Sequence, residues 1–117
     1  MPAYEISRTV ETIATGHAAS TGVARTDAAE SVREALTDAG GDALRGVDAA
    51  AEDVYEFPAG PFDPYRVRVQ ATVTVAVEAA DESSAIERGR ERVADVLTAA
   101  DLDDWEYVGT TRLDPAA

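Results

Sequence analysis

Several residue types are missing from this chain, and each absence excludes a kind of chemistry. There is no Cys among the 117 residues, so disulfides, thiolate zinc sites and cysteine nucleophiles are excluded. All 10 basic residues are Arg, and the absence of Lys excludes a Walker A loop and Schiff-base catalysis. No GxGxxG, GxSxG or HExxH motif occurs. We therefore expect no cofactor, no metal centre and no catalytic residue.

Negative charge, by contrast, is abundant. The chain has 23 acidic residues and a net charge of −13, while Leu, Ile, Val and Phe make up about a fifth of it, near the limit for folded chains. Molar salt shortens the Debye length to about 3 Å and so screens self-repulsion. Salting-out ions also strengthen apolar burial. The chain resembles small acidic proteins of haloarchaea or their viruses, although no specific family is recognised.

No segment of the sequence has the character of a membrane anchor. The first residues lack the basic and apolar regions of a signal peptide, so we expect none. The stretch of residues 69–77, which has no charged side chain, contains Gln70, Thr72 and Thr74 and is too short to span a bilayer. We expect no membrane partner, and a cytoplasmic location, or a virion location if a virus encodes the chain.

Residues 65–79 alternate strictly between apolar and polar side chains. Val67, Val69 and the later valines share one parity, whereas Arg66, Arg68, Gln70, Thr72 and Thr74 take the other. This alternation predicts a strand with one buried and one solvated face, as in an antiparallel or mixed sheet.

A helix and a closing strand follow. Ala85 to Ala100 repeat apolar residues at helical spacing, with Gly89 on the apolar stripe, which indicates close approach to the sheet. The helix cap is either Asp81 or a capping box of Ser84 with Glu87. Residues 104–113 read as the closing strand.

The first half repeats this plan. Residues 4–14 predict a strand, with Arg8 breaking the apolar parity, so that a bulge or an edge position is expected. Thr26 or Asp27 is the expected cap of a helix that ends at Gly40-Gly41. Residues 16–25 read as a loop or irregular helix start, and residues 44–57 as a weaker strand.

The two halves also align in sequence. A shift of 61 residues places Tyr4 on Tyr65, Val32 on Val93 and Leu36 on Leu97, and gives 12 identities in 56 positions. We therefore predict a single domain, residues 1–117, with repeat 1 at about 1–57, a Pro-rich linker at 58–64 and repeat 2 at about 65–117. This β-α-β-β-α-β order predicts an α+β, ferredoxin-like split βαβ fold with both helices on one sheet face.

One stretch of the second half has a recognisable local form. Residues 75–93, VAVEAADESSAIERGRERV, resemble a strand–helix junction found in many small prokaryotic and phage domains. The resemblance covers about 20 residues and contains no catalytic residue. It implies a piece of fold and no site.

Three other features of the sequence are candidate sites. His17 is the only imidazole, and it is expected to be a surface residue because no serine spacing favours a triad. Residues 101–106, DLDDWE, superficially resemble a calcium loop, but Glu106 stands where an EF-hand needs Gly. Paired carboxylates could serve acid–base catalysis, yet so many acids are present that the sequence singles out no pair.

The polar face of strand 65–79 is the candidate interaction surface. We assign to it Arg66, Arg68, Gln70, Thr72 and Glu5, with Arg8 near the repeat-equivalent position of the Arg pair. These arginines could bind phosphate or a partner carboxylate. Alternatively, they could form cross-strand ion pairs with Glu5 and Glu11, which share the matching parity of the first strand.

Three functions remain open. The first is a non-catalytic protein–protein interaction or assembly module of a halophile, within a virion or a larger complex, with a second copy or another protein as partner. The second is a small-ligand-binding regulatory domain, and the third is a small enzyme using carboxylate and Arg chemistry. Nucleic acid is disfavoured as a partner, because the charge is −13 and no basic patch is visible.

Overall fold

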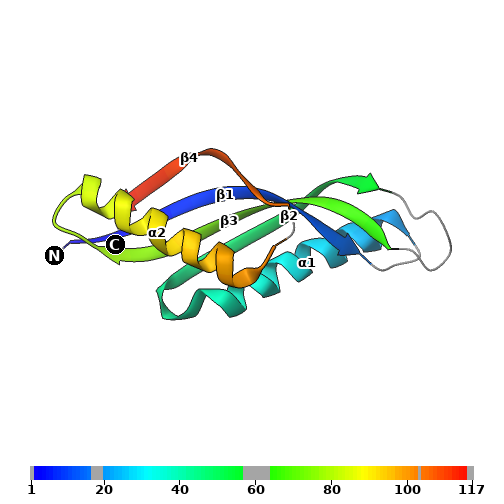
Figure 1. Cartoon of the computed structure of the whole chain (residues 1–117), viewed down its shortest axis with the longest axis horizontal. Coiled ribbons are helices and arrows are strands. Elements are labelled where there is room, and N and C mark those ends of the chain that lie inside the picture. Colours follow the sequence, from blue (N-terminus) through cyan, green and yellow to red (C-terminus); the bar gives the residue numbers. More distant parts are fainter. Residues whose placement is uncertain (1, 17–19, 57–63, 103, 116–117) are drawn as a thin grey trace.

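The computed structural model describes residues 2–16, 20–56, 64–102 and 104–115. Expectations for His17, for linker residues 58–63 and for Asp103 lie outside the described residues. The Cα trace measures 55 × 24 × 22 Å along its principal axes, and the strands run along the longest of them (Figure 1).

Four strands form one antiparallel sheet in the order β2-β3-β1-β4, and both helices lie against the same face (Figure 1). The elements are β1 (Ala3–Gly16), α1 (Thr21–Gly40), a 3-10 turn (Gly41–Ala43), β2 (Leu44–Glu56), β3 (Tyr65–Glu78), α2 (Glu82–Ala100) and β4 (Glu106–Pro115). This is the predicted α+β, ferredoxin-like arrangement. Every pairing is antiparallel, so the mixed sheet that the sequence left open is not formed.

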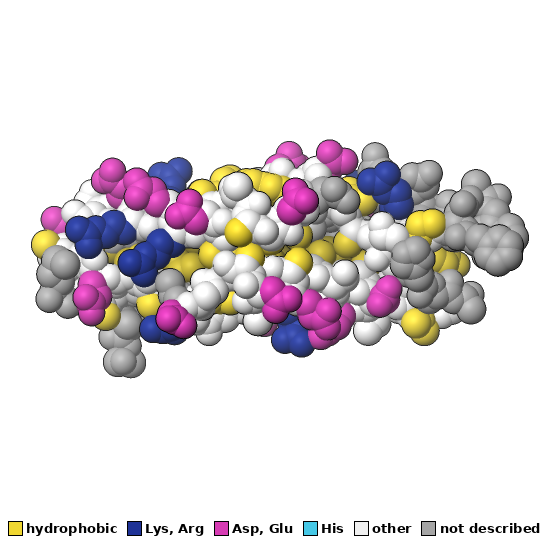
Figure 2. Space-filling view, turned by 60° about the horizontal axis from the view of Figure 1, so that its bottom comes forward, with side chains coloured by type: hydrophobic (Ala, Val, Ile, Leu, Met, Phe, Trp, Pro, Cys, Tyr) yellow, Lys and Arg dark blue, Asp and Glu magenta, His cyan; other side chains and the backbone are white. Residues whose placement is uncertain are grey.

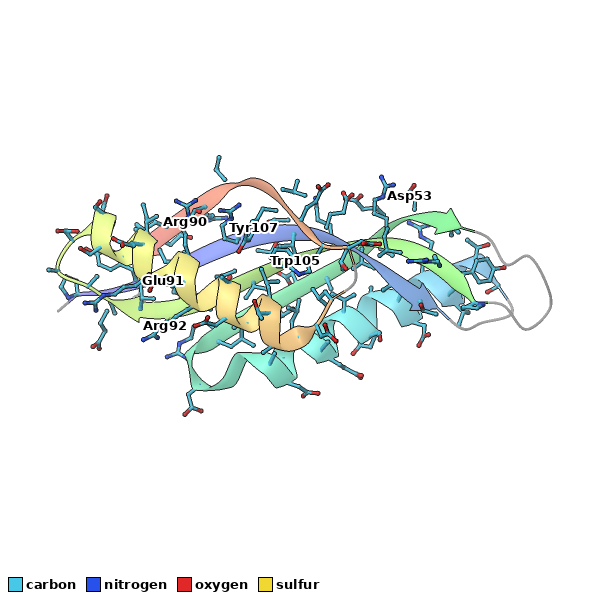
Figure 3. The ribbon with its side chains drawn as sticks, viewed as in Figure 1. Asp53, Arg90, Glu91, Arg92, Trp105 and Tyr107 are labelled. Carbon is cyan, nitrogen blue, oxygen red and sulfur yellow. The ribbon has the colours of Figure 1, made fainter. Side chains whose placement is uncertain are left out.

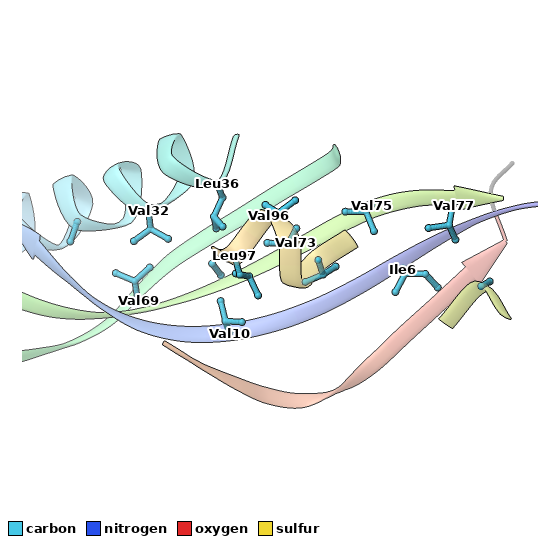
Figure 4. Packing of buried hydrophobic residues seen from close by; sticks show 14 of the residues in the cluster. Ile6, Val10, Val32, Leu36, Val69, Val73, Val75, Val77, Val96 and Leu97 are labelled. Carbon is cyan, nitrogen blue, oxygen red and sulfur yellow. The ribbon is translucent and has the colours of Figure 1, made fainter. Parts of the chain in front are cut away.

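The helix-covered face holds the core. On β3, alternate residues from Val67 to Val77 are buried, and on β1 Ile6 and Val10 are fully buried. Leu36 from α1 and Leu97 from α2 pack onto these valines (Figure 4). The predicted alternation on β3 is therefore confirmed, because every second side chain of a strand points to the same face.

The first helix begins earlier than predicted. We expected Thr26 or Asp27 as its cap, but α1 starts at Thr21 and its N-cap is Ser20. The Ser20 hydroxyl accepts a hydrogen bond from the backbone N–H of Val23 at 3.4 Å, which satisfies one of the free donors at a helix start.

Tertiary packing explains this early start. Residues 16–25 contain one large apolar side chain, Val23, which is exposed, so their helical periodicity is weak. Ala24 is nevertheless fully buried. A Cβ placed on Gly16 would clash with the Ala24 backbone, so the first turn of α1 lies directly against the end of β1.

The second helix begins as one of the two predicted alternatives. Asp81 is the N-cap, and its carboxylate accepts a hydrogen bond from the backbone N–H of Ser84 at 2.8 Å. Gly89 approaches the sheet as predicted, because a Cβ there would stand 2.6 Å from Cγ2 of Ile6. The absence of a side chain at Gly89 therefore sets the helix–sheet distance.

The irregularity predicted for the first strand lies in its neighbour. β1 is a central strand that pairs with β3 along its whole length, so the edge position was wrong. The break occurs where β4 pairs with Ser7 and Thr9: Arg112 lies opposite Ser7, and Val108 opposite Thr9. The extra residues are in β4 and include Gly109, whose φ of 73° favours glycine. β4 also starts and ends two residues later than the predicted 104–113.

Candidate functional site

The face of the sheet that the helices leave uncovered carries the predicted interaction residues. We call it the open face. Its central rows come from the two long strands: Glu5, Ser7, Thr9 and Glu11 of β1, and Arg66, Arg68, Gln70, Thr72 and Thr74 of β3. Each of these side chains is half-buried by its neighbours along and across the strands.

Hydroxyl groups meet across the centre of the open face. The Ser7 and Thr74 hydroxyls lie 2.7 Å apart, and the Thr9 and Thr72 hydroxyls lie 2.9 Å apart. The centre of the open face is therefore lined by short side chains whose hydroxyl groups are hydrogen-bonded across the strands. A hollow of about 650 Å³, open to solvent, lies over these hydroxyls and reaches Asp48 of β2 and Arg112 of β4.

Arg68 forms the cross-strand ion pair that the sequence offered as an alternative to ligand binding. Its Nε lies 3.5 Å from Oε1 of Glu11 and 3.8 Å from Oδ1 of Asp53 on β2. The Glu11 contact was predicted. Asp53 was missed, because β2 has a weak alternating pattern and its pairing with β3 is irregular between Ala51 and Asp53.

Glu5 does not take part in this ion pair. Glu5 lies opposite Ala76, whereas Arg66 lies opposite Thr15 near the other end of β1. Arg66 forms no ion pair with a described side chain. The structure thus brings Arg66, Arg68, Gln70 and Thr72 together on one strand and separates them from Glu5. The expected Glu5 ion pair is wrong, because the antiparallel register places Glu5 ten positions from Arg66.

Arg8, in contrast to Glu5, is not part of the open face. Its guanidinium lies on the helix-covered side, with Cζ 3.9 Å from the centre of the Tyr107 ring. Its Nη1 also donates to Oγ1 of Thr111 at 3.1 Å. Trp105 stacks edge-on against Tyr107, with ring centres 5.3 Å apart (Figure 3). The parity break at Arg8 thus reflects a cation–π contact beside the β4 bulge.

The described residues contain no group of three or more side chains that could hold a metal ion. Among the described carboxyl groups, Asp81 and Glu30 have clearly shifted pKa values. Hydrogen bonds from Ser84 lower the pKa of Asp81, and a hydrogen bond from Arg33 lowers the pKa of Glu30. Both groups stabilise helices in their charged form, which is not the behaviour of a general acid at neutral pH. Neither α1 nor α2 combines the length and apolar character needed to cross a membrane.

The chain matches no protein-family model and no curated protein. Among solved structures it is similar to an amidase of the hydantoinase/carbamoylase family from Burkholderia multivorans, with 17% identity and a TM-score of 0.35. A second such amidase, from Burkholderia vietnamiensis, has 19% identity and a TM-score of 0.26. The matches cover 97% of this chain but span only 30% and 27% of the amidases. Similarities this low carry no argument about function.

Proposed function

We propose that this chain is a non-catalytic assembly module of a halophile, and that its open face packs against the open face of a second copy. The uncovered sheet face carries the proposal. Two strands of 14 residues lie side by side there, and short hydroxyl side chains occupy the centre. An uncovered face with short central side chains suits sheet-on-sheet packing at about 10 Å.

The charges on the open face favour a twofold arrangement. Ten positions along β3 separate Arg66 from Ala76, the residue opposite Glu5, a distance of about 33 Å. An antiparallel pair of copies places Arg66 of each over Glu5 of the other. The twofold axis then passes between Gln70 and Thr72, and the interface is isologous.

The size of the face is sufficient for a stable pair. The molecule measures 55 × 24 Å along its two longer axes, whereas a standard interface needs about 800 Å² from each partner. The net charge of −13 opposes association at low salt, and molar salt screens this repulsion to within about 3 Å. Association is therefore expected at high salt and lost on dilution.

The first experiment is light scattering coupled to size exclusion, in molar KCl and again at low salt. We expect a defined oligomer at high salt that dissociates or unfolds at low salt. A strict monomer at high salt, with no partner in a pull-down, would remove the proposal and make ligand screening the next step.

Variants test which face is used. Thr72→Arg buries two like charges near the axis, where packed sheets exclude the screening salt and desolvation is costly, so we expect dissociation. Ser31→Arg makes the same change of charge on the exposed side of α1 and should leave the oligomer intact. The single changes Arg66→Glu and Glu5→Arg should each weaken association, and together they should restore it. An oligomer insensitive to Thr72→Arg would show that another surface is used.

Two versions of the assembly differ in location. In one the chain is a component of a virion, and in the other it belongs to a cytoplasmic complex. Both rest on the acidic, lysine-free composition, which fits haloarchaea and their viruses alike. The presence of the chain in purified virus particles would support the first version, and its recovery only from cell extract the second.

A further inference from the structure

A cleft outside the open face gathers three arginines in this acidic molecule. β2 begins opposite Val75, but β3 continues to Glu78, so the edge of residues 76–78 is not covered by β2. A cleft of about 620 Å³ lies along this edge, with Arg88 and Arg92 of α2 on one side and Arg45, at the start of β2, on the other. We call it the arginine cleft.

The three arginines are held by backbone carbonyl groups rather than by carboxylates. Nη1 of Arg88 donates to the Glu78 carbonyl at 2.7 Å, and Nη1 of Arg92 donates to the Ala76 carbonyl at 2.8 Å. Nη1 of Arg45 donates to the Asp42 carbonyl at 2.8 Å. Within the described part of the chain, none of the three forms an ion pair, in contrast to Arg33, Arg68 and Arg112.

This anchoring fixes the guanidinium groups and leaves most of their donors for a ligand. A guanidinium has five N–H donors in a rigid fork, and it binds carboxylate or phosphate oxygens in pairs. Arg25 also donates to edge carbonyls, those of Ala51 and Glu52 on β2. Hydrogen bonding to backbone carbonyl groups therefore accounts for the position of a single arginine. It does not account for the gathering of three arginines around one cleft.

The net charge of the residues that line the cleft is opposite in sign to the net charge of the whole chain. The two carboxylates that line it, Asp42 and Glu78, leave one excess positive charge against the three arginines, while the whole chain carries −13. On the surface that Figure 2 shows, several basic side chains lie toward the left end, where α2 begins, with acidic side chains among them.

The geometry points to a compact oxyanion as the ligand. We infer that the arginine cleft binds a small molecule carrying two or more phosphate or carboxylate groups. Arg88 and Arg92 are one helical turn apart, about 5–6 Å between Cβ atoms, so each can engage a separate oxyanion group. An added peptide strand fits less well, because these two arginines already occupy the edge carbonyl groups of Ala76 and Glu78.

Calorimetric titration of the full chain tests this inference. Pyrophosphate and citrate are the probes, at constant ionic strength set with KCl, and an acidic peptide is a third arm. We expect saturable binding of pyrophosphate or citrate, and the stronger of the two identifies the chemistry as phosphate or carboxylate. Binding of neither anion, or of the peptide alone, would overturn the inference.

Variants locate the binding. Arg88→Gln with Arg92→Gln should weaken it about tenfold or more, since each change removes charge-assisted hydrogen bonds to the ligand. Arg90→Gln changes the charge of the same helix, but Arg90 projects toward β4, away from Arg92 (Figure 3), so binding should persist. Equal losses in both variants would mean a general charge effect and no site.

Two further variants keep the test decisive. If the double variant fails to fold, Arg45→Gln removes a cleft arginine without touching α2 and should also weaken binding. Glu78→Gln removes a repulsive carboxylate while keeping the Glu78 carbonyl that Arg88 uses, and it should tighten binding. Unchanged affinity in both variants would place the anion elsewhere.

Discussion

The helix-covered face and the open face are built from the same two strands, β1 and β3, but their chemistry differs. Val73 and Thr72 are neighbours in sequence, yet Val73 is fully buried beneath the helices and Thr72 faces outward to meet Thr9. Burial of apolar area is the main stabilising force in folding, whereas part-exposed hydroxyl pairs add little. The covered face therefore determines stability, and the open face is free to serve association.

The largest expected effect comes from a cavity in the covered face. Leu97→Ala removes a fully buried side chain of α2, and such changes cost about 2–5 kcal/mol. Urea unfolding at fixed KCl measures the loss. Thr72→Ala on the open face is the comparison and should cost below about 1 kcal/mol. Similar losses in both variants would contradict the division between the faces.

A smaller loss is expected from filling the close contact between α2 and β1. Gly89→Ala places a Cβ against the Ile6 side chain, 2.6 Å from its Cγ2, and overpacking of this kind costs about 1–3 kcal/mol. Gly22→Ala on α1 is the matched control, because nothing lies within 4 Å of a Cβ there. It should be neutral or stabilise by up to about 1 kcal/mol. Thermal unfolding of the two variants distinguishes crowding from helix propensity.

Removing a hydroxyl pair from the open face should change stability still less. Thr9→Val together with Thr72→Val replaces both partners by groups of the same shape, which is close to neutral for folding. We expect a free energy of unfolding, measured in urea, within about 1 kcal/mol of that of the parent chain. A large loss would mean that the open face contributes to the fold as the covered face does.

The smallest expected effect is the pH dependence of stability that arises from the N-cap of α2. The Asp81 pKa is lowered by hydrogen bonds from Ser84, so its charged form stabilises the folded state. This stabilisation is present above about pH 4 and is lost as pH falls through the lowered pKa. The cap of α1 is Ser20, which does not titrate. Asp81→Ser should therefore reduce the acid dependence of stability below about pH 4, as measured by urea midpoints at each pH. If the acid dependence of stability is unchanged in this variant, other carboxylates cause it.

The fold was predictable where the periodicity was strong. The alternation on β3, the helical spacing of α2 and the contact at Gly89 each follow from local residue order, because a strand and a helix repeat their faces every 2 and 3.6 residues. The start of α1 was not predictable, since Ala24 and Ala28 acquire their importance only by packing on the sheet. The ion pair between Arg68 and Asp53 was also not predictable, because it depends on the irregular register of β2 against β3.

By itself, the sequence determined the acidic, cysteine-free and lysine-free chemistry, the β-α-β-β-α-β order and the parity that separates valines from hydroxyls. These are local properties, fixed by residue type and spacing. Only the tertiary structure decided which polar residues meet. Antiparallel register separated Glu5 from Arg66, a bulge in β4 accompanied the contact of Arg8 with Tyr107, and the overhang of β3 beyond β2 brought Arg45 beside Arg88 and Arg92. Such contacts depend on how strands align and helices pack, since residues distant in sequence become neighbours only then.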